Sequence, residues 1–182
     1  MKLLSLALLP ILAGSLVSAA SVSGIEPRDV DAGPTPAQTA VTYIKNTNNK
    51  AAINPVCFYS GQTMVTKIVN KKSYTSVKTA DAALGAFKGA PRNCKSIADV
   101  LAKAGVQSSA LSQSDWKAVS KALAENVSGK AYVLLGKDIR SNSVWITDEK
   151  PALKANGAVT LEVWEIETDG SVVKTNKTKA NV

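Results

Sequence analysis

The chain has 182 residues, a net charge of +8, two cysteines and no histidine. This length suits one domain with a buried core. The missing histidine excludes Ser-His-Asp and Cys-His catalysis, histidine-ligated zinc and histidine-paired ribonuclease chemistry. Any acid–base chemistry must therefore use carboxylates, lysines or tyrosines.

Residues 1–20 predict a secretory signal peptide. Lys2 supplies the positive start, residues 3–17 are almost wholly apolar, and the small or permitted residues Val17-Ser18-Ala19 allow cleavage after Ala19 or Ala20. This run is shorter than the roughly 20 residues that span a bilayer, and no later segment approaches that length. We therefore expect a soluble mature protein that is secreted outside the cell or delivered to a host.

Residues 21–37 predict a flexible leader, because proline, glycine and charged residues dominate there. Pro27-Arg28 is a candidate processing point. Residues 38–176 are expected to form a single domain, followed by a polar C-terminal tail at 177–182.

The first part of this domain predicts three strands and then three amphipathic helices. The β-branched and aromatic runs 41–44, 56–59 and 64–69 indicate strands. Apolar residues at helical spacing, each series followed by a glycine, indicate helices over 77–87, 97–104 and 116–127. Ser112 with Asp115 is typical of the N-cap of the third helix.

The last part of the domain predicts strands again. The apolar run 132–135 indicates a central strand, 144–147 a short strand closed by Pro151, and 159–166 a long strand with a β-bulge near Trp164. Asp169-Gly170 predicts a hairpin turn returning through 172–173. The expected fold class is α+β, with a mainly antiparallel sheet and three consecutive helices inserted between two groups of strands (βββ-ααα-ββββ).

Cys57 and Cys94 are expected to form one disulfide, as an isolated pair does in an oxidising compartment. The alternative is a metal-binding or catalytic thiol, although two thiols without histidine make a poor zinc site. Asn126 and Asn176 begin N-glycosylation sequons, and Asn126 adjoins the buried face of a predicted helix.

The positive charge does not point to a nucleic-acid partner. All but three of the 22 basic residues are lysine, and the arginines are scattered, whereas base and phosphate recognition favour arginine interleaved with aromatics. We expect a weak electrostatic preference for anionic cell walls or membrane surfaces and no specific nucleic-acid binding.

Two groups of carboxylates are weak catalytic candidates. Glu165 and Glu167 share one strand face and resemble the catalytic strand of ADP-ribosyltransferases, but Arg140 directly precedes Ser141-Asn142-Ser143, which is the wrong spacing for that family. Asp138 with Asp148-Glu149-Lys150 resembles the metal site of restriction-type nucleases, although Pro151 interrupts the pattern.

A carbohydrate site is the other open alternative. Glu162 and Glu165 resemble a glycosidase pair, but they point to opposite faces of a regular strand. Trp145 and Trp164 are candidates for a ligand surface, whereas Trp116 falls on the core stripe of its helix.

The whole layout is similar to that of small secreted proteins of filamentous fungi: export signal, Pro-Arg leader, compact domain, few cysteines and a lysine-rich surface. This resemblance implies an effector- or elicitor-like virulence protein. We expect a non-enzymatic interaction protein, without metal or cofactor, that acts on a protein or cell-wall polysaccharide of a host, a competitor or the producer. The alternatives are a small carboxylate-dependent enzyme or toxin and a cell-wall carbohydrate binder.

Overall fold

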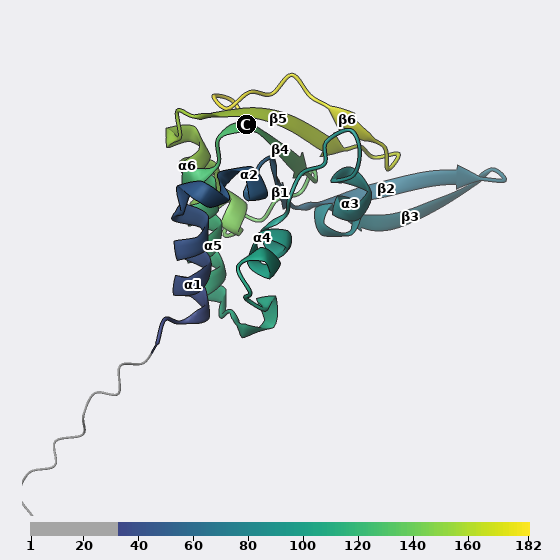
Figure 1. Cartoon of the computed structure of the whole chain (residues 1–182). Coiled ribbons are helices and arrows are strands. Elements are labelled where there is room, and N and C mark those ends of the chain that lie inside the picture. Colours follow the sequence, from purple (N-terminus) through teal and green to yellow (C-terminus); the bar gives the residue numbers. More distant parts are fainter. Residues whose placement is uncertain (1–32) are drawn as a thin grey trace, which may run out of the picture. The chain divides into compact units, whose positions relative to one another are not determined.

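The computed structural model describes residues 33–182. The expected signal peptide, the Pro27-Arg28 processing point and most of the leader lie outside the described residues. Over this range the chain has mixed α+β structure, with six α-helices, one four-stranded sheet and one two-stranded sheet (Figure 1). None of its helices is both long and apolar enough to cross a membrane.

The main sheet has the order β1-β4-β5-β6, formed by β1 (Val56–Ser60), β4 (Gly129–Leu135), β5 (Val159–Ile166) and β6 (Val172–Lys174). The strands β1, β4 and β5 run parallel, and only β6 is antiparallel to its neighbour. The prediction of a mainly antiparallel sheet was therefore wrong for this sheet. The buried central strand and the Asp169-Gly170 hairpin turn are confirmed.

A separate antiparallel hairpin leaves the main sheet directly after β1. It consists of β2 (Gln62–Val69) and β3 (Lys72–Thr79), which pair along their whole length. Asn70 and Lys71 both have positive φ angles, 51° and 62°, as a tight two-residue hairpin turn requires. The helix predicted over 77–87 is α3 (Ala80–Phe87), and it begins three residues later than expected, because Val77 fits its apolar spacing but lies at the end of β3.

Helix α1 (Pro36–Lys45) replaces the strand expected at 41–44. The Thr35 and Gln38 side chains form a capping box, and Pro36 occupies the first turn, where it needs no hydrogen-bond donor. Ala40 and Ile44 then lie on the buried face that packs against α5. Helical capping and burial thus outweigh the β-branched sequence.

The next helices are α2 (Lys50–Ile53), α4 (Ile97–Lys103) and α5 (Gln113–Asn126), with short 3-10 turns at Thr47–Asn49 and Ser108–Ala110. The helices expected near 97–104 and 116–127 are confirmed. Ser112 caps α5 together with Asp115, as predicted. The predicted order of elements is nevertheless not matched, because two helices precede β1 and a further helix lies between β4 and β5.

Residues 145–155 are helical and do not contain the strand predicted at 144–147. A π-helical turn (Trp145–Glu149) continues into α6 (Lys150–Ala155). Pro151 lies in the first turn of α6, where its missing N–H does no harm, so it begins a helix rather than ending a strand. This segment is the crossover that makes β4 and β5 parallel.

Both faces of the main sheet are covered, which also explains the pattern that resembled a β-bulge. Val163 belongs to the larger core under α1, α4, α5 and α6, whereas Trp164 and Ile166 belong to a second core beside α3. The pairing of β5 with β4 and with β6 is continuous, so no bulge is present in either ladder. Apolar residues on both faces of one strand are sufficient to shift the apparent register.

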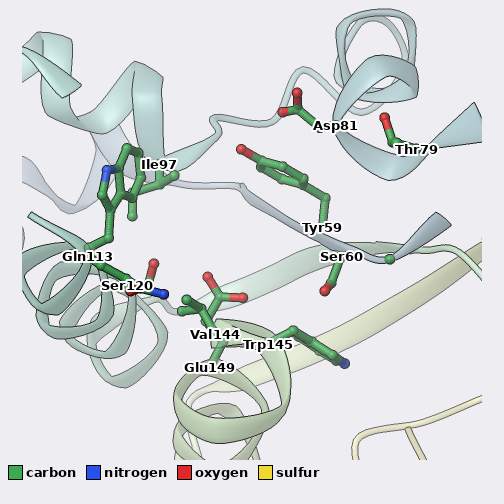
Figure 2. Close-up of a pocket in the computed structure, with 12 residues that line it drawn as sticks. Tyr59, Ser60, Thr79, Asp81, Ile97, Gln113, Ser120, Val144, Trp145 and Glu149 are labelled. Carbon is green, nitrogen blue, oxygen red and sulfur yellow. The ribbon is translucent and has the colours of Figure 1, made fainter. Parts of the chain in front are cut away.

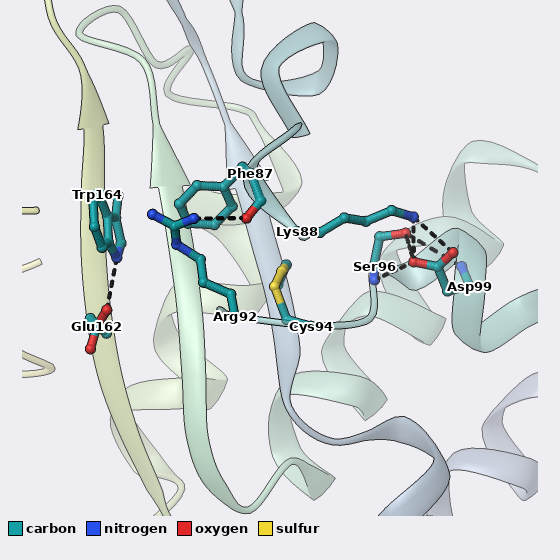
Figure 3. Close-up of a disulfide and its surroundings, with 9 residues drawn as sticks. Phe87, Lys88, Arg92, Cys94, Ser96, Asp99, Glu162 and Trp164 are labelled. Carbon is teal, nitrogen blue, oxygen red and sulfur yellow. Dashed lines mark hydrogen bonds and ion pairs between the residues drawn. A yellow bond between two sulfur atoms is a disulfide. The ribbon is translucent and has the colours of Figure 1, made fainter. Parts of the chain in front are cut away.

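The disulfide joins Cys57 on β1 to Cys94 in the segment between α3 and α4 (Figure 3). It closes a loop with a sequence separation of 37, which on the chain-entropy model stabilises the fold by about 4 kcal/mol. At the other end of the chain, residues 177–182 contact the folded part. Val182 packs against the larger core, and Lys154 Nζ donates to the Ala180 carbonyl at 3.2 Å.

Candidate functional site

The carboxyl ends of the three parallel strands meet at one edge of the sheet. Ser60 pairs with Leu135, and Leu135 pairs with Glu165, so β1, β4 and β5 end at the same level. In sheets with parallel strands this edge is where ligands usually bind.

The segments that follow β1 and β4 cross closely at this edge. The Gly136 N–H donates to Ser60 O at 2.8 Å, and Gln62 and Asp138 exchange two backbone hydrogen bonds of 2.8 and 2.9 Å. A Cβ atom on Gly136 would lie only 2.2 Å from the Gln62 nitrogen. The backbone itself therefore fixes the geometry of the edge beside β1.

A pocket of about 630 Å³ opens beside the end of β1 (Figure 2). Its walls come from the end of β1, the start of α3, the starts of α4 and α5, and the π-helical turn. Most of its surface is apolar, although several polar side chains, two of them carboxylates, also face it. The full lining is Tyr59, Ser60, Gly61, Thr79, Asp81, Ile97, Gln113, Trp116, Ser120, Val144, Trp145 and Glu149.

Glu149 is the buried acid of this pocket. Its residue is only 8% exposed, and its carboxylate points into the cavity from the π-helical turn (Figure 2). Burial raises the pKa of Glu149 to about 7, the charge of Asp148 adds to the rise, and a hydrogen bond with Ser120 opposes it. Near neutral pH this carboxyl group is therefore divided between its protonated and ionised forms.

Tyr59 and Asp81 face the pocket from β1 and from the start of α3. The Tyr59 hydroxyl points toward the Asp81 carboxylate (Figure 2). Burial, followed by the charge and hydrogen bonding of Asp81, raises the pKa of Tyr59 to about 12. Tyr59 thus stays neutral and keeps its hydroxyl hydrogen at physiological pH.

The predicted candidates Glu165 and Glu167 lie elsewhere on the same edge, where they bind lysines. Lys137 Nζ lies 2.6 Å from Glu165 Oε2 and 2.7 Å from Glu167 Oε1, and Lys177 bonds the other oxygen of Glu165. Burial alone would raise the pKa of Glu165, but the hydrogen bonds from the two lysines outweigh it and lower that pKa. The same bonds raise the pKa of Lys137.

The other two catalytic candidates do not join this cluster. Arg140 is exposed in the segment after β4 and lines a small cavity of about 190 Å³ together with Asp138 and Ser143. Asp148 accepts a hydrogen bond from Thr147 beside the π-helical turn. The Glu149 pocket is lined by none of the four predicted candidates.

The two candidate ligand-surface tryptophans have different places. Trp145 is buried and lines the pocket. Trp164 packs edge-on against Phe87 at 5.9 Å, lies under the Arg92 guanidinium at 4.1 Å and donates its Nε1–H to Glu162 at 3.0 Å (Figure 3). Trp164 is therefore a core contact of the second cluster.

The regular pairing of β5 places Glu162 and Glu165 on opposite faces of the strand, as the sequence alone indicated for an unbulged strand.

Of the two sequon asparagines, Asn176 is exposed, while Asn126 is half-buried and donates to the Ala122 carbonyl at 2.8 Å. Across residues 33–182 no group of three cysteine, aspartate or glutamate side chains is placed to hold a metal ion.

The sequence reasoning missed Glu149, Tyr59 and Asp81 as site residues. One signal was present: Trp145, Glu149 and Leu153 are spaced four residues apart, which on a helix places Glu149 on the buried face. The other two residues carry no such pattern, because only the folded chain brings positions 59, 81 and 149 to one cavity.

No protein-family model, curated protein or solved structure matches the chain. The fold and the site define an α+β protein with a pocket of small-molecule size at the carboxyl edge of parallel strands.

Proposed function

We propose that this is a secreted, non-enzymatic binding protein, effector- or elicitor-like, that acts outside the producing cell and binds a small ligand in the Glu149 pocket. The proposal of secretion is supported by the charged, apolar and small-residue order of residues 1–20. The observation that carries ligand binding is a nearly buried carboxylate aimed into a cavity whose surface is mainly apolar.

The pocket favours a ligand with an apolar face and one or two hydrogen-bond donors. Trp116, Trp145 and Ile97 supply flat or apolar wall, which suits a sugar ring or another flat body. Glu149 accepts hydrogen bonds when ionised, and Asp81 adds a second acceptor on the other side. Hydroxyl or amine groups on the ligand would therefore be bound at two points.

Catalysis by Glu149 is the second candidate, because a pKa near 7 is what a general acid or base needs at neutral pH. In such an enzyme the catalytic carboxylate would be Glu149 and not Glu165 or Glu167, which the sequence alone suggested. Both earlier residues are held in ion pairs with Lys137, which leaves them less suited to proton transfer.

The test uses the tryptophans of the pocket as reporters. Oligosaccharides of chitin and of β-glucan, and an aromatic amine such as tryptamine, are titrated into the purified protein while its fluorescence is recorded. We expect a saturable change with at least one probe and a loss of affinity of roughly tenfold or more in Glu149→Ala, since a buried hydrogen bond to a charged group is removed. Glu125→Gln, on the exposed side of α5, is the matched control.

Three outcomes separate the candidates. Saturable binding without conversion of the probe supports a binding protein. Conversion of the probe that is lost in Glu149→Gln supports the enzyme instead. The absence of any saturable change, combined with a biological effect that survives Glu149→Ala, would refute a functional pocket.

A further inference from the structure

The hairpin β2–β3 carries most of the exposed apolar surface. Six large hydrophobic side chains are exposed within the described range, and five of them lie on this hairpin. Ile68 is the most exposed at 78%, and the others on the hairpin are Met64, Val69, Tyr74 and Val77. Clustered apolar exposure of this kind marks an interaction surface.

The base of the hairpin is anchored to the folded domain. Val65 is buried against Gly170, the Thr66 N–H donates to the Thr168 carbonyl at 2.8 Å, and Lys78 Nζ donates to the Gly170 carbonyl at 2.7 Å. The outer part, residues 67–74, extends beyond these contacts, and we call it the hairpin tip (Figure 1). All eight of its residues are exposed.

The strand register places all the paired lysines of the hairpin on one of its two faces. Met64 lies opposite Val77, and Ile68 lies opposite Ser73, so one face is free of charge. On the other face Lys67 lies opposite Tyr74, and Val69 lies opposite Lys72. Two of the three tip lysines are thus next to an exposed apolar or aromatic side chain, and the third, Lys71, lies in the turn.

The charge of the hairpin has one sign. Residues 62–79 contain four lysines, three of them in the tip, and no acidic residue. The acids that approach the hairpin, Asp138 and Asp169, do so at its base, beside Gln62 and Lys78. The tip therefore presents apolar side chains surrounded by positive charge.

We propose that the hairpin tip docks on an anionic lipid bilayer, with Ile68, Val69 and Tyr74 inserted among the headgroups and the tip lysines bound to lipid phosphates and carboxylates. Four residues of strand span about 13 Å, which is enough to reach the depth of roughly 5–10 Å at which interfacial segments lie. Lysine beside apolar and aromatic residues is the composition that such surfaces favour.

A lipid surface fits this tip better than a protein partner or a second copy of the chain. Lysine is depleted in protein interfaces, where arginine is enriched, and the hairpin has lysines and no arginine. Two hairpins meeting tip to tip would bring six lysines together without an acid between them, which opposes self-association.

The test is co-sedimentation of the purified chain with vesicles of phosphatidylcholine alone or of phosphatidylcholine mixed with phosphatidylserine. We expect binding to the anionic vesicles at least tenfold stronger than to the neutral ones, and weakened by salt. Replacing Lys67, Lys71 and Lys72 by glutamine should weaken binding roughly 100-fold, at about fivefold per lysine. Ile68→Ser with Val69→Ser should also weaken it at least tenfold.

Two matched control variants make the same kinds of substitution outside the hairpin. Replacing Lys103, Lys117 and Lys121 on α4 and α5 by glutamine, or Val173 by serine, should change binding less than threefold. The proposal is overturned if neither vesicle type retains the protein, if both retain it equally, or if the helix lysine variant loses as much as the tip variant. It is also overturned if sedimentation velocity shows a dimer that disappears in the Ile68→Ser, Val69→Ser variant.

Discussion

Glu149 should make the stability of this protein fall as the pH rises toward neutrality, and Glu149→Gln should remove that dependence. The pKa of a free glutamate is about 4.5, whereas burial raises that of Glu149 to about 7 in the folded chain. Between these values the folded state holds a proton that the unfolded state releases. The free energy of unfolding therefore decreases through this pH window and stays low above it.

The size of the effect follows from the shift. A difference of about 2.5 pKa units, at 1.36 kcal/mol per unit, corresponds to roughly 3 kcal/mol. This loss is complete above about pH 7 and absent below about pH 4.5. For a domain of this size each kcal/mol changes the melting temperature by about 2–4 °C, so the full effect is about 6–12 °C.

Denaturant unfolding from about pH 4 to about pH 8 measures this difference directly. Glu149→Gln should match the wild type at the acid end and be more stable by up to about 3 kcal/mol at the alkaline end. Glu125→Gln, which changes an exposed carboxylate on α5, should follow the wild type throughout. If the curves of Glu149→Gln and the wild type stay parallel over the whole range, burial of an ionised Glu149 is not what limits stability.

Two further substitutions test the packing around the sheet. Arg92→Lys should lower stability by about 1–2 kcal/mol in thermal unfolding, because a lysine cannot stack as a plane on the two aromatic rings that the guanidinium contacts, whereas exposed Arg140→Lys should be nearly neutral. Gly136→Ala should destabilise by more than about 3 kcal/mol, since its Cβ would collide with the Gln62 backbone, whereas Gly85→Ala in the open interior of α3 should stabilise by about 0.5–1 kcal/mol. An equal effect of the two glycine changes would contradict the close crossing beside β1.

Local chemistry was sufficient to predict several elements. The Ser112–Asp115 capping box and the apolar spacing that follows it indicated α5, and the continuous apolar run at 132–135 indicated a central strand. The pairing of Cys57 with Cys94 was predictable because the chain has only two cysteines, which allow a single intramolecular disulfide. In each case the sequence pattern lies within a few neighbouring residues, or, for the cysteines, only one pairing is possible.

Elements that depend on a distant partner were not predictable from the same patterns. Val41 and Ile44 are β-branched residues typical of a strand, yet they lie in α1, which is stabilised by packing on α5. The capping box at Thr35 and Gln38 was the competing signal, and burial decides between the two only in the folded chain.

One misassigned segment accounts for both the wrong sheet and the missed site. Reading 144–147 as a strand gives an antiparallel partner for β4 and turns Glu149 into a loop charge. A helix there forms a crossover, which makes β4 and β5 parallel and sets their carboxyl ends level with that of β1. The same helical segment carries Glu149 to the pocket beside β1. A buried carboxylate that lowers the stability of the fold is typical of a functional site rather than of a packing position. The ligand titration and the unfolding series should therefore be measured on the same Glu149 variants, so that a loss of binding can be compared with a gain in stability.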